Sequence, residues 1–350
     1  MFKKSLFILL LAAVSIGSAR ERKTVLITGG AGFIGSNFVS YLYEKYPEYD
    51  LIVLDALTYA GSLENIDPAI LGSERFRFIH GSVADCSLVE KVMGECQLVV
   101  HFAAETHVTR SIADDLVFFV TDVLGTRALM SALVKHAKTV ERFIHVSTSE
   151  VYGTAEEGRP MDEEHPLNPR SPYAAAKAGA DRLVYAYGCT FDVPVVTVRP
   201  FNNYGPRQHP EKMIPRFIAA AIQKKPLQIH GTGDQCRDWV HTSDVAAALD
   251  AILHYPDFSK LQNQAINLGS GKATSVMEIA QAVLEAFDLP PTFLEFVDER
   301  PGQVACHLAE IGKAASLLDW KARTCLKEGL ANTIEWYVNN PTYWRNRWEE

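Results

Sequence analysis

The chain has 350 residues, of which 47% are hydrophobic and 22% are charged, and these values are ordinary for a globular protein. This length is sufficient for one large or two ordinary domains with a sizeable core. The formal net charge of −8 and the pI near 5.8 argue against a nucleic-acid-binding protein, because such proteins usually carry a basic face. A local basic pocket for a small phosphorylated molecule is still compatible with this charge.

The cysteines show no pattern of a metal site. None of them forms a C-x-x-C pair or joins histidines at the spacing of metal ligands, so we predict neither a metal site nor a disulfide framework. We expect free thiols instead. The six residues are Cys86, Cys96, Cys189, Cys236, Cys306 and Cys325.

The N-terminus resembles a secretory signal peptide. Residues 1–4 are basic, residues 5–16 are almost all apolar, and residues 17–19 are small, as at a cleavage site. The apolar run is short for a membrane span, which needs about 20 residues. An uncleaved anchor and an upstream start codon without structural meaning are alternatives. We exclude residues 1–21 from the fold and expect a cytoplasmic protein, with secretion or membrane anchoring through residues 1–19 as alternatives.

The first expected strand leads into a glycine-rich turn. Residues 23–28 are apolar, the sequence GGAGFIG follows at 29–35, and residues 36–45 have the pattern of an amphipathic helix. Strand, glycine turn and helix are the context of a dinucleotide-binding fingerprint, in which the backbone approaches a pyrophosphate at the helix N-terminus. The sequence therefore predicts a cofactor-binding turn. Its residues are Gly29, Gly32, Phe33, Ile34 and Gly35.

The second expected strand, residues 51–54, ends at an acidic residue. Asp55 lies 20 residues beyond Gly35, where a carboxylate that binds the ribose of a dinucleotide is expected. A carboxylate at this position repels a 2′-phosphate, so we predict NAD rather than NADP. The alternative is that Asp55 only caps a loop.

Further strands alternate with helices. Residues 76–80, 98–102, 143–146 and 193–198 have the composition of strands, and residues 114–136 contain two helical stretches. This alternation predicts an α/β fold with a doubly wound, Rossmann-like parallel sheet in an NAD-binding domain at residues 22–199. After the fourth strand, small side chains would let the cofactor pass close to the backbone. They are Ala103 and Ala104.

Beyond residue 199 the chain becomes rich in turns. A helix is expected at residues 214–223, a short strand at 227–230, and a second helix at 244–254. We predict a smaller α/β substrate-binding region at residues 200–345. It is interleaved with the first domain, to which a part near residues 240–270 returns.

Two stretches carry candidate catalytic groups. Thr148, Ser149 and Glu150 follow an expected buried strand, a common position for active-site groups in open α/β sheets. Tyr173 and Lys177 are four residues apart, on one face of a helix. A lysine beside a phenol favours the phenolate, so this pair can make tyrosine a base near neutral pH.

The glycine fingerprint, Thr148 and the Tyr173-x-x-x-Lys177 motif together resemble the extended short-chain dehydrogenase/reductase superfamily. Within it, the chain is most similar to the nucleotide-sugar 4,6-dehydratases, and among these to the dTDP-glucose 4,6-dehydratases. Five short stretches in sequence order carry this resemblance. They are residues 57–65 (LTYAGSLEN), 101–108 (HFAAETHV), 202–206 (NNYGP), 210–215 (PEKMIP) and 235–239 (QCRDW).

The resemblance implies a mechanism for a lyase. Tyr173, with Lys177 and Thr148 nearby, would remove the proton of the sugar C4 hydroxyl while hydride passes from C4 to NAD. Glu150 would then remove the acidified C5 proton, water would leave from C6, and hydride would return to C6 to give a 4-keto-6-deoxy sugar. The resemblance also implies a homodimer that binds a nucleotide-sugar and no nucleic acid, with membrane contact only through an uncleaved N-terminal anchor.

The resemblance further implies which side chains bind the ligands. Asp85 is a candidate for the adenine of NAD, and His107 for the sugar. Arg237 is expected at the pyrophosphate, because a guanidinium binds phosphate through two directed hydrogen bonds. The other implied substrate-binding residues are Asn202, Asn203, Lys212, Met213, Asn267 and Arg300.

Two departures from the family pattern leave the substrate open. Ser149 stands where an aspartic acid usually donates a proton to the leaving hydroxyl, and Asp122 stands where an asparagine is usual. The Thr148-Ser149-Glu150 triplet also resembles GDP-mannose 4,6-dehydratases, in which the glutamate can be both base and acid, and UDP-glucuronate decarboxylases. A 4-epimerase, which has no evident use for Glu150, and a non-enzymatic cofactor-binding protein are further alternatives.

Overall fold

The computed structural model describes residues 22–155, 159–299 and 306–348. The signal-like segment and Arg300, one of the expected substrate-binding residues, lie outside the described residues.

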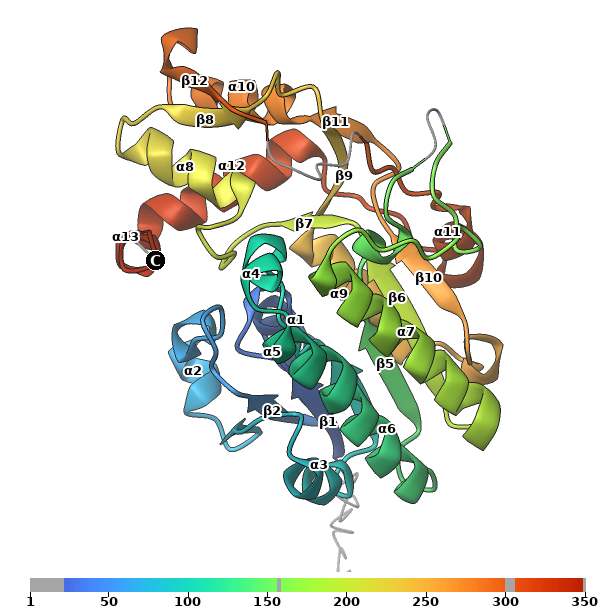
Figure 1. The fold of residues 1–350 in the computed structure, drawn as a ribbon. Coiled ribbons are helices and arrows are strands. Elements are labelled where there is room, and N and C mark those ends of the chain that lie inside the picture. The colour runs from blue at the N-terminus through green and yellow to red at the C-terminus, as the bar shows by residue number, and fades with distance from the viewer. Residues whose placement is uncertain (1–21, 156–158, 300–305, 349–350) are drawn as a thin grey trace, which may run out of the picture.

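A seven-stranded parallel sheet forms the larger part of the molecule (Figure 1). The strand order is β10-β6-β5-β4-β1-β2-β3. Successive strands are therefore added outward from β1 on one side and outward from β4 on the other, so the strand order reverses between β1 and β4. This arrangement confirms the predicted doubly wound α/β fold. The strands are β1 (Lys23–Thr28), β2 (Tyr49–Asp55), β3 (Phe76–His80), β4 (Leu98–His101), β5 (Arg142–Val146), β6 (Val195–Pro200) and β10 (Ala265–Leu268).

Alternate side chains of the central strands enter two separate cores. In β1, Val25 and Ile27 pack in one core with helices α1 and α9, while Leu26 packs in the other with α3, α6 and α7. Successive side chains of a strand point to opposite faces of the sheet. Because helices cover both faces here, side chains on both faces are buried. These helices are α1 (Phe33–Lys45), α3 (Cys86–Met93), α6 (Thr126–Lys135), α7 (Pro172–Phe191) and α9 (Thr242–Leu253).

The two helical stretches expected at residues 114–136 form one continuous helix. It runs through α5 (Leu116–Phe118) and a π-helical segment, η2 (Phe119–Gly125), into α6. A π-helical segment of this kind often marks a functional site. Here it contains Asp122, one of the two departures from the family pattern.

A smaller region lies beyond one end of the sheet (Figure 1). It contains a three-stranded sheet in the order β11-β9-β7, a parallel pair of strands β12-β8, and several helices packed in a core of their own. Its elements are β7 (Asn202–Tyr204), β8 (Leu227–His230), β9 (Cys236–His241), β11 (Ala273–Ser275), β12 (Leu294–Val297), α8 (Met213–Ile222), α10 (Val276–Ala286), α12 (Leu326–Asn339) and α13 (Pro341–Arg345).

Short helical elements complete the described chain. They connect the larger elements and are all of seven residues or fewer. They are η1 (Leu63–Asn65), α2 (Pro68–Leu71), α4 (Val108–Ala113), η3 (Ser149–Tyr152), η4 (Phe258–Lys260), η5 (Pro291–Phe293) and α11 (Gly312–Leu318).

The expectation of six free thiols is wrong for two cysteines. Cys236 and Cys306 form a disulfide, with their Cα atoms 4.6 Å apart. The two residues are 70 positions apart in the sequence, and they meet because the segment at residues 306–309 runs beside β9. A contact of this kind depends on the tertiary fold, so the cysteine spacing could not indicate it.

Candidate active site

The glycine turn after β1 fits the backbone of a dinucleotide. Gly29 has φ of +68°, and a Cβ there would lie 2.6 Å from the backbone nitrogen of Ala103. Gly32 is the N-cap of α1, and no side chain caps this helix or places a negative charge in its first turn. Phe33, Ile34 and Gly35 form that first turn. The free N–H groups and the helix dipole therefore favour an anion.

Asp55 is fixed against the glycine turn at the end of β2. Its Oδ2 accepts a hydrogen bond from the Ala31 N–H (2.9 Å), and its Oδ1 accepts one from the Leu57 N–H (2.8 Å). Burial raises the pKa of this carboxyl above its ordinary value, and the two backbone donors oppose this shift. The carboxylate therefore lies at the carboxyl edge of the sheet, beside the place where a dinucleotide would cross.

Two other expected cofactor positions differ in their surroundings. Ala103 follows β4, and its N–H donates to the Thr28 hydroxyl (3.3 Å); both it and Ala104 are half-buried beside the glycine turn. Asp85, by contrast, is exposed and is the N-cap of α3, where its Oδ1 accepts hydrogen bonds from the backbone of Ser87 and Leu88. The structure thus accounts for Asp85 as a helix cap.

The catalytic turn begins where β5 ends. Thr148 is the N-cap of η3, and its hydroxyl accepts a hydrogen bond from the Glu150 N–H (3.2 Å). This cap holds the backbone so that Glu150 is partly exposed, with 31% of its side-chain surface accessible, while Ser149 is only 2% exposed. The two neighbours in sequence therefore differ in access to the site.

Tyr173 and Lys177 lie on the buried face of α7, facing this turn. The Lys177 Nζ donates a hydrogen bond to the Val146 carbonyl at the end of β5 (2.8 Å). Burial raises the pKa of Tyr173 well above its ordinary value, the charges of Asp122 and Glu150 raise it further, and a hydrogen bond with Thr148 opposes the shift. Desolvation therefore dominates the pKa of Tyr173 in this structure, and the activation of the phenol by Lys177 stays a prediction.

Asp122 is a buried carboxyl beside the same pair. It is 1% exposed, its Oδ1 accepts a hydrogen bond from the Glu105 N–H (2.8 Å), and its Oδ2 has no hydrogen bond among the described residues. Burial raises the pKa of Asp122 to about 7, against the opposing charge of Lys177. Near neutral pH this carboxyl is thus partly protonated. The protonated form is uncharged, like the asparagine that the family usually has at this position.

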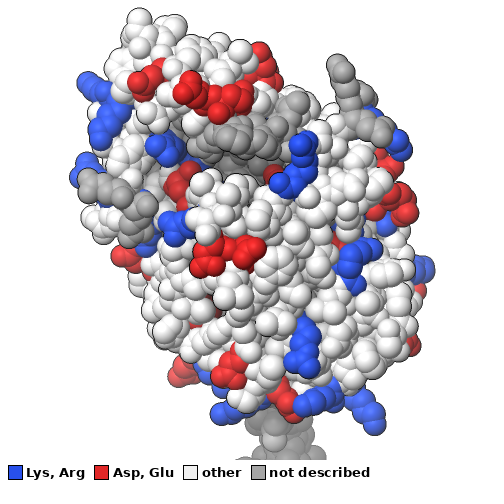
Figure 2. All heavy atoms as spheres, viewed as in Figure 1, with Lys and Arg blue, Asp and Glu red and all other residues white. Residues whose placement is uncertain are grey.

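Arg237 in β9 lies opposite the catalytic turn. Burial lowers the pKa of its guanidinium, and the charge of Glu150 opposes this shift. The next residue, Asp238, anchors the strand, because its carboxylate accepts hydrogen bonds from the N–H groups of Ser270, Gly271 and Ala309. Lys and Arg side chains also lie on both sides of the hollow between the two regions (Figure 2).

The prediction that Asn267 contacts the substrate is wrong. It is fully buried in β10, where its Oδ1 accepts a hydrogen bond from the Tyr152 hydroxyl (2.7 Å) and its Nδ2 donates to the Met161 carbonyl (3.0 Å). Tyr152 in turn accepts a hydrogen bond from Arg199, which pairs with Asp181 through two nitrogens. Asn267 therefore belongs to a buried network behind the catalytic turn.

The other expected substrate-binding residues line the boundary between the two regions. The His107 Nε2 lies 3.2 Å from Glu211 Oε2, and the Lys212 Nζ lies 3.3 Å from Glu211 Oε1. Met213 begins α8 directly after Lys212. Two half-buried asparagines in β7 complete this set, Asn202 and Asn203.

A model of the GDP-mannose 4,6 dehydratase family matches residues 26–333 of the chain. The protein belongs to this family. The predicted resemblance to nucleotide-sugar 4,6-dehydratases of the extended short-chain dehydrogenase/reductase superfamily is thereby confirmed.

Relatives in this dehydratase family extend over most of the chain. One relative is the Arabidopsis thaliana protein RHM3, a trifunctional UDP-glucose 4,6-dehydratase/UDP-4-keto-6-deoxy-D-glucose 3,5-epimerase/UDP-4-keto-L-rhamnose-reductase. The two sequences are 39% identical over 327 residues, and the match covers 92% of this chain but only 48% of RHM3. The chain thus spans about half the length of this relative. It is 40% identical to the low-salt glycan biosynthesis protein Agl12 of Haloferax volcanii over 316 residues, which cover 90% of the chain and 99% of Agl12.

A solved structure from the same family has the same fold. It is DesIV, the dTDP-glucose 4,6-dehydratase of Streptomyces venezuelae with NAD and TYD bound. The TM-score is 0.86 at 38% identity, and the match covers 92% of this chain and 99% of DesIV.

The dehydratase site contains one histidine that the sequence analysis did not select. His307 is fully buried, and its Nδ1 lies 4.0 Å from Glu150 Oε1. Its position 157 residues beyond Glu150 in the sequence gave no signal of this proximity.

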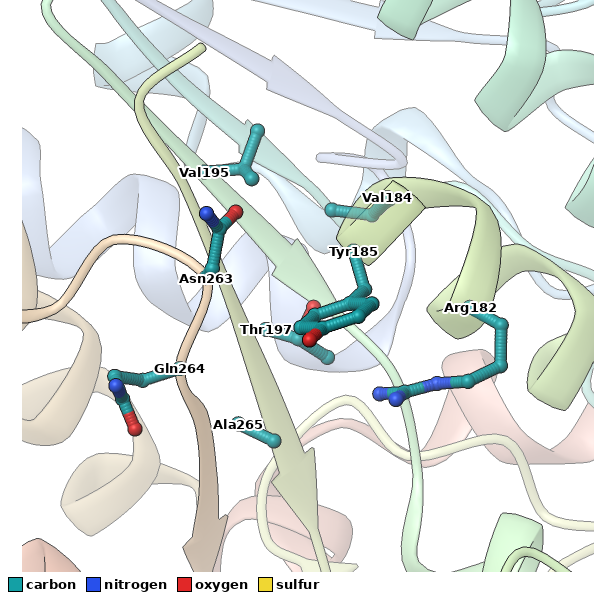
Figure 3. A pocket seen from close by; sticks show the side chains of 8 residues that line it. All are labelled: Arg182, Val184, Tyr185, Val195, Thr197, Asn263, Gln264 and Ala265. Atoms are coloured by element: carbon teal, nitrogen blue, oxygen red, sulfur yellow. The ribbon is translucent and has the colours of Figure 1, made fainter. Parts of the chain in front are cut away.

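A separate small cavity lies away from the dehydratase site. Figure 3 shows Arg182 and Tyr185 of α7 on one side, and Asn263 and Gln264 of the loop before β10 on the other. None of its lining residues is among the candidate catalytic or binding residues. We assign it no role in the reaction.

Proposed function

We propose that the protein is an NAD-dependent nucleotide-sugar 4,6-dehydratase that converts dTDP-glucose or a related nucleotide-hexose to the 4-keto-6-deoxy sugar. The observation that carries this proposal is the position of Glu150, whose carboxylate lies close enough to Tyr173 and Arg237 for its charge to affect both pKa values. Oxidation of an alcohol needs only Tyr173 and Lys177. A carboxylate beside them provides a base for a second proton at the neighbouring carbon.

The residues of the larger region fit NAD. The turn from Gly29 to Gly35 would hold the pyrophosphate, Asp55 the ribose, and Ala103 and Ala104 would lie against the cofactor. When bound, NAD would supply the hydride acceptor for C4 of the sugar and, once reduced, the hydride donor for C6.

Tyr173 serves the first half of the reaction. Its phenolate accepts the proton of the C4 hydroxyl, and positive charge in the site favours this phenolate by offsetting the effect of burial on the pKa of Tyr173. Thr148 holds a hydrogen bond to the phenol, and Lys177 lies four residues further along α7, on the same buried face. The resulting C4 ketone acidifies the C5 proton.

Glu150 serves the second half. Its partly exposed carboxylate removes the C5 proton and passes it to the C6 hydroxyl, which leaves as water. Ser149 is a poor acid for this step, because a hydroxyl is weakly acidic and because this one is 2% exposed. Arg237 lies opposite and is suited to the pyrophosphate of the substrate, since a guanidinium binds phosphate through paired hydrogen bonds.

The proposal is tested by incubating the purified protein separately with dTDP-glucose, UDP-glucose, GDP-mannose and UDP-glucuronate. We expect at least one hexose nucleotide to yield a product that is lighter by one water and absorbs in strong alkali. Release of carbon dioxide from UDP-glucuronate, with no product from the hexoses, would instead establish a decarboxylase. Interconversion of hexoses at C4 without loss of water would establish an epimerase.

We also propose a homodimer that forms through the helices beside the active site. Ile112 of α4, Leu116 of α5 and Leu124 of η2 are 68%, 67% and 54% exposed, a high exposure for large apolar side chains so close together in the chain. Leu116–Lys135 is apolar and long enough to span a membrane, but half of it is buried within the fold, which favours a partner helix as its contact.

A further inference from the structure

His307 lies in a rigid position behind the catalytic turn. The preceding residue forms the Cys236–Cys306 disulfide, and the His307 N–H donates a hydrogen bond to the Cys236 carbonyl (3.1 Å). The side chain is fully buried. Backbone, disulfide and packing together fix the direction in which the imidazole points.

One nitrogen of the His307 imidazole is hydrogen-bonded, and the other lies toward Glu150. Its Nε2 lies 2.6 Å from the Gly153 carbonyl, which can only accept, so Nε2 carries the proton. In the neutral ring, Nδ1 is therefore an acceptor. This nitrogen has no hydrogen bond within the described residues, and it lies 4.0 Å from Glu150 Oε1.

The groups around the ring favour its neutral form. Burial lowers the pKa of His307; Arg237 and His165 lower it further, while the charge of Glu150 and the hydrogen bond to Gly153 raise it. An ionised Glu150 cannot donate to a neutral Nδ1, because both groups are acceptors. A protonated Glu150 can donate, so the contact becomes favourable only after Glu150 has taken a proton.

We propose that His307 is a positioning residue for the elimination step, in which its Nδ1 accepts a hydrogen bond from Glu150 once Glu150 has removed the C5 proton. The C5–H bond breaks and an O–H bond forms on Glu150; the C6–O bond then breaks, the same proton leaves with the hydroxyl as water, and Glu150 returns to the carboxylate. His307 holds the acid in place between these events. This role rests on the proposed dehydratase function. It provides a hydrogen-bond partner for Glu150, which acts both as the base at C5 and as the acid at the C6 hydroxyl.

The distance requires a modest movement. A hydrogen bond between these atoms is about 1 Å shorter than the separation of 4.0 Å, and contacts in ligand-free active sites often tighten when substrate binds. Glu150 has partly exposed space in which to rotate, whereas His307 does not. We therefore assign the movement to Glu150.

The test separates oxidation at C4 from elimination. In His307→Gln, the amide can still donate to Gly153 but offers no acceptor at the position of Nδ1. We expect the rate of nicotinamide reduction after mixing with substrate to stay within about twofold of wild type, whereas water loss slows about tenfold or more and the reduced cofactor accumulates. His307→Asn places an amide near the position of Nδ1, and we expect it to recover part of the elimination rate.

His165→Gln is the matched control, because His165 lies near His307 but makes an edge-to-face contact with the ring of Tyr152. We expect it to leave both rates unchanged. Wild-type elimination in His307→Gln, or an equal loss of oxidation and elimination in both His307 variants, would overturn the positioning role alone. Absence of water loss by the wild-type protein from every hexose nucleotide would overturn the proposed function as well.

Discussion

At the scale of single residues, the site differs from its family pattern in how it handles protons. One partly exposed carboxyl, Glu150, stands beside a buried hydroxyl, Ser149, where a pair of carboxyls is usual. A second carboxyl, Asp122, lies buried beside Tyr173 where an amide is usual. Both differences can be tested by substitution. A change at Glu150 affects one step of the reaction, and a change at Asp122 affects stability in one range of pH.

Glu150→Gln keeps the shape of the side chain but removes the base. We expect dehydration to fall by about a hundredfold or more, while reduction of the nicotinamide on mixing with substrate persists, since C4 oxidation depends on Tyr173. Rapid-mixing absorbance and product mass measure the two steps. Ser149→Ala is the control and should retain turnover. Full turnover in Glu150→Gln would contradict the role assigned to Glu150.

Asp122→Asn tests the buried carboxyl through stability. The pKa of Asp122 is raised from 3.8 to about 7, so between these values the folded protein holds a proton that the unfolded chain has released. The free energy of unfolding contributed by this group therefore falls as pH rises through this range, by at most about 4 kcal/mol. We expect the variant to gain stability relative to wild type at about pH 8 compared with about pH 5.

Denaturant unfolding at the two pH values measures this difference. Parallel pH dependence in the two proteins would show that Asp122 ionises as freely in the folded protein as in the unfolded chain.

Local sequence patterns indicated the candidate catalytic residues, but they did not indicate the burial or the contacts of these residues. Gly29, Tyr173 and Lys177 could be found because their spacing along one strand-turn-helix unit or one helix face has a direct structural meaning. His307 and the burial of Asn267 could not, because both depend on contacts between segments more than 100 residues apart.

At the scale of elements, strands of the central sheet were predicted well because both of their faces are buried. The expected strand at residues 23–28 coincides with β1, and the expected strand at 143–146 lies within β5. The three-residue strand β7 lies within a stretch expected to be a loop, since it pairs only with β9 and has no periodicity of its own. Tertiary pairing, not composition, forms such strands.

Asn267→Ala tests the reassignment of this residue to the support of the catalytic turn. The change leaves the hydroxyl of Tyr152 and the carbonyl of Met161 without their buried partner, so we expect a loss of about 1–3 kcal/mol in the free energy of unfolding. The KM for the nucleotide-sugar should change little. Arg237→Ala is the contrasting variant, with a raised KM and nearly wild-type stability. The reverse pattern would return Asn267 to the substrate site.

At the scale of the whole molecule, two regions meet at the carboxyl edge of the sheet, and the catalytic and substrate-binding groups come from both. The turn after β5 provides Glu150 and α7 provides Tyr173, while the smaller region provides Arg237. The fold class followed from the alternation of strands and helices. The relative position of the smaller region did not, because it depends on long-range anchors such as Asp238.

Leu116→Glu tests the proposed dimer. A charge at this exposed apolar position would be desolvated in a helix-to-helix interface, so we expect dissociation to monomers in sedimentation velocity. Phe296→Glu, at an equally large and 58% exposed side chain of β12, is the control and should leave the dimer intact. An unchanged oligomeric state in Leu116→Glu, or a monomeric wild type, would contradict the proposed interface.

The path of one hydrogen atom tests the central claim most directly. dTDP-glucose or UDP-glucose, whichever reacts faster, is prepared with deuterium at C4 and converted in ordinary water, and the product is examined by mass and by magnetic resonance. We expect a product that has lost one water and carries the deuterium at C6, because the hydride leaves C4 and returns within the same active site. Deuterium that stays at C4, or that is lost to solvent, would contradict the account.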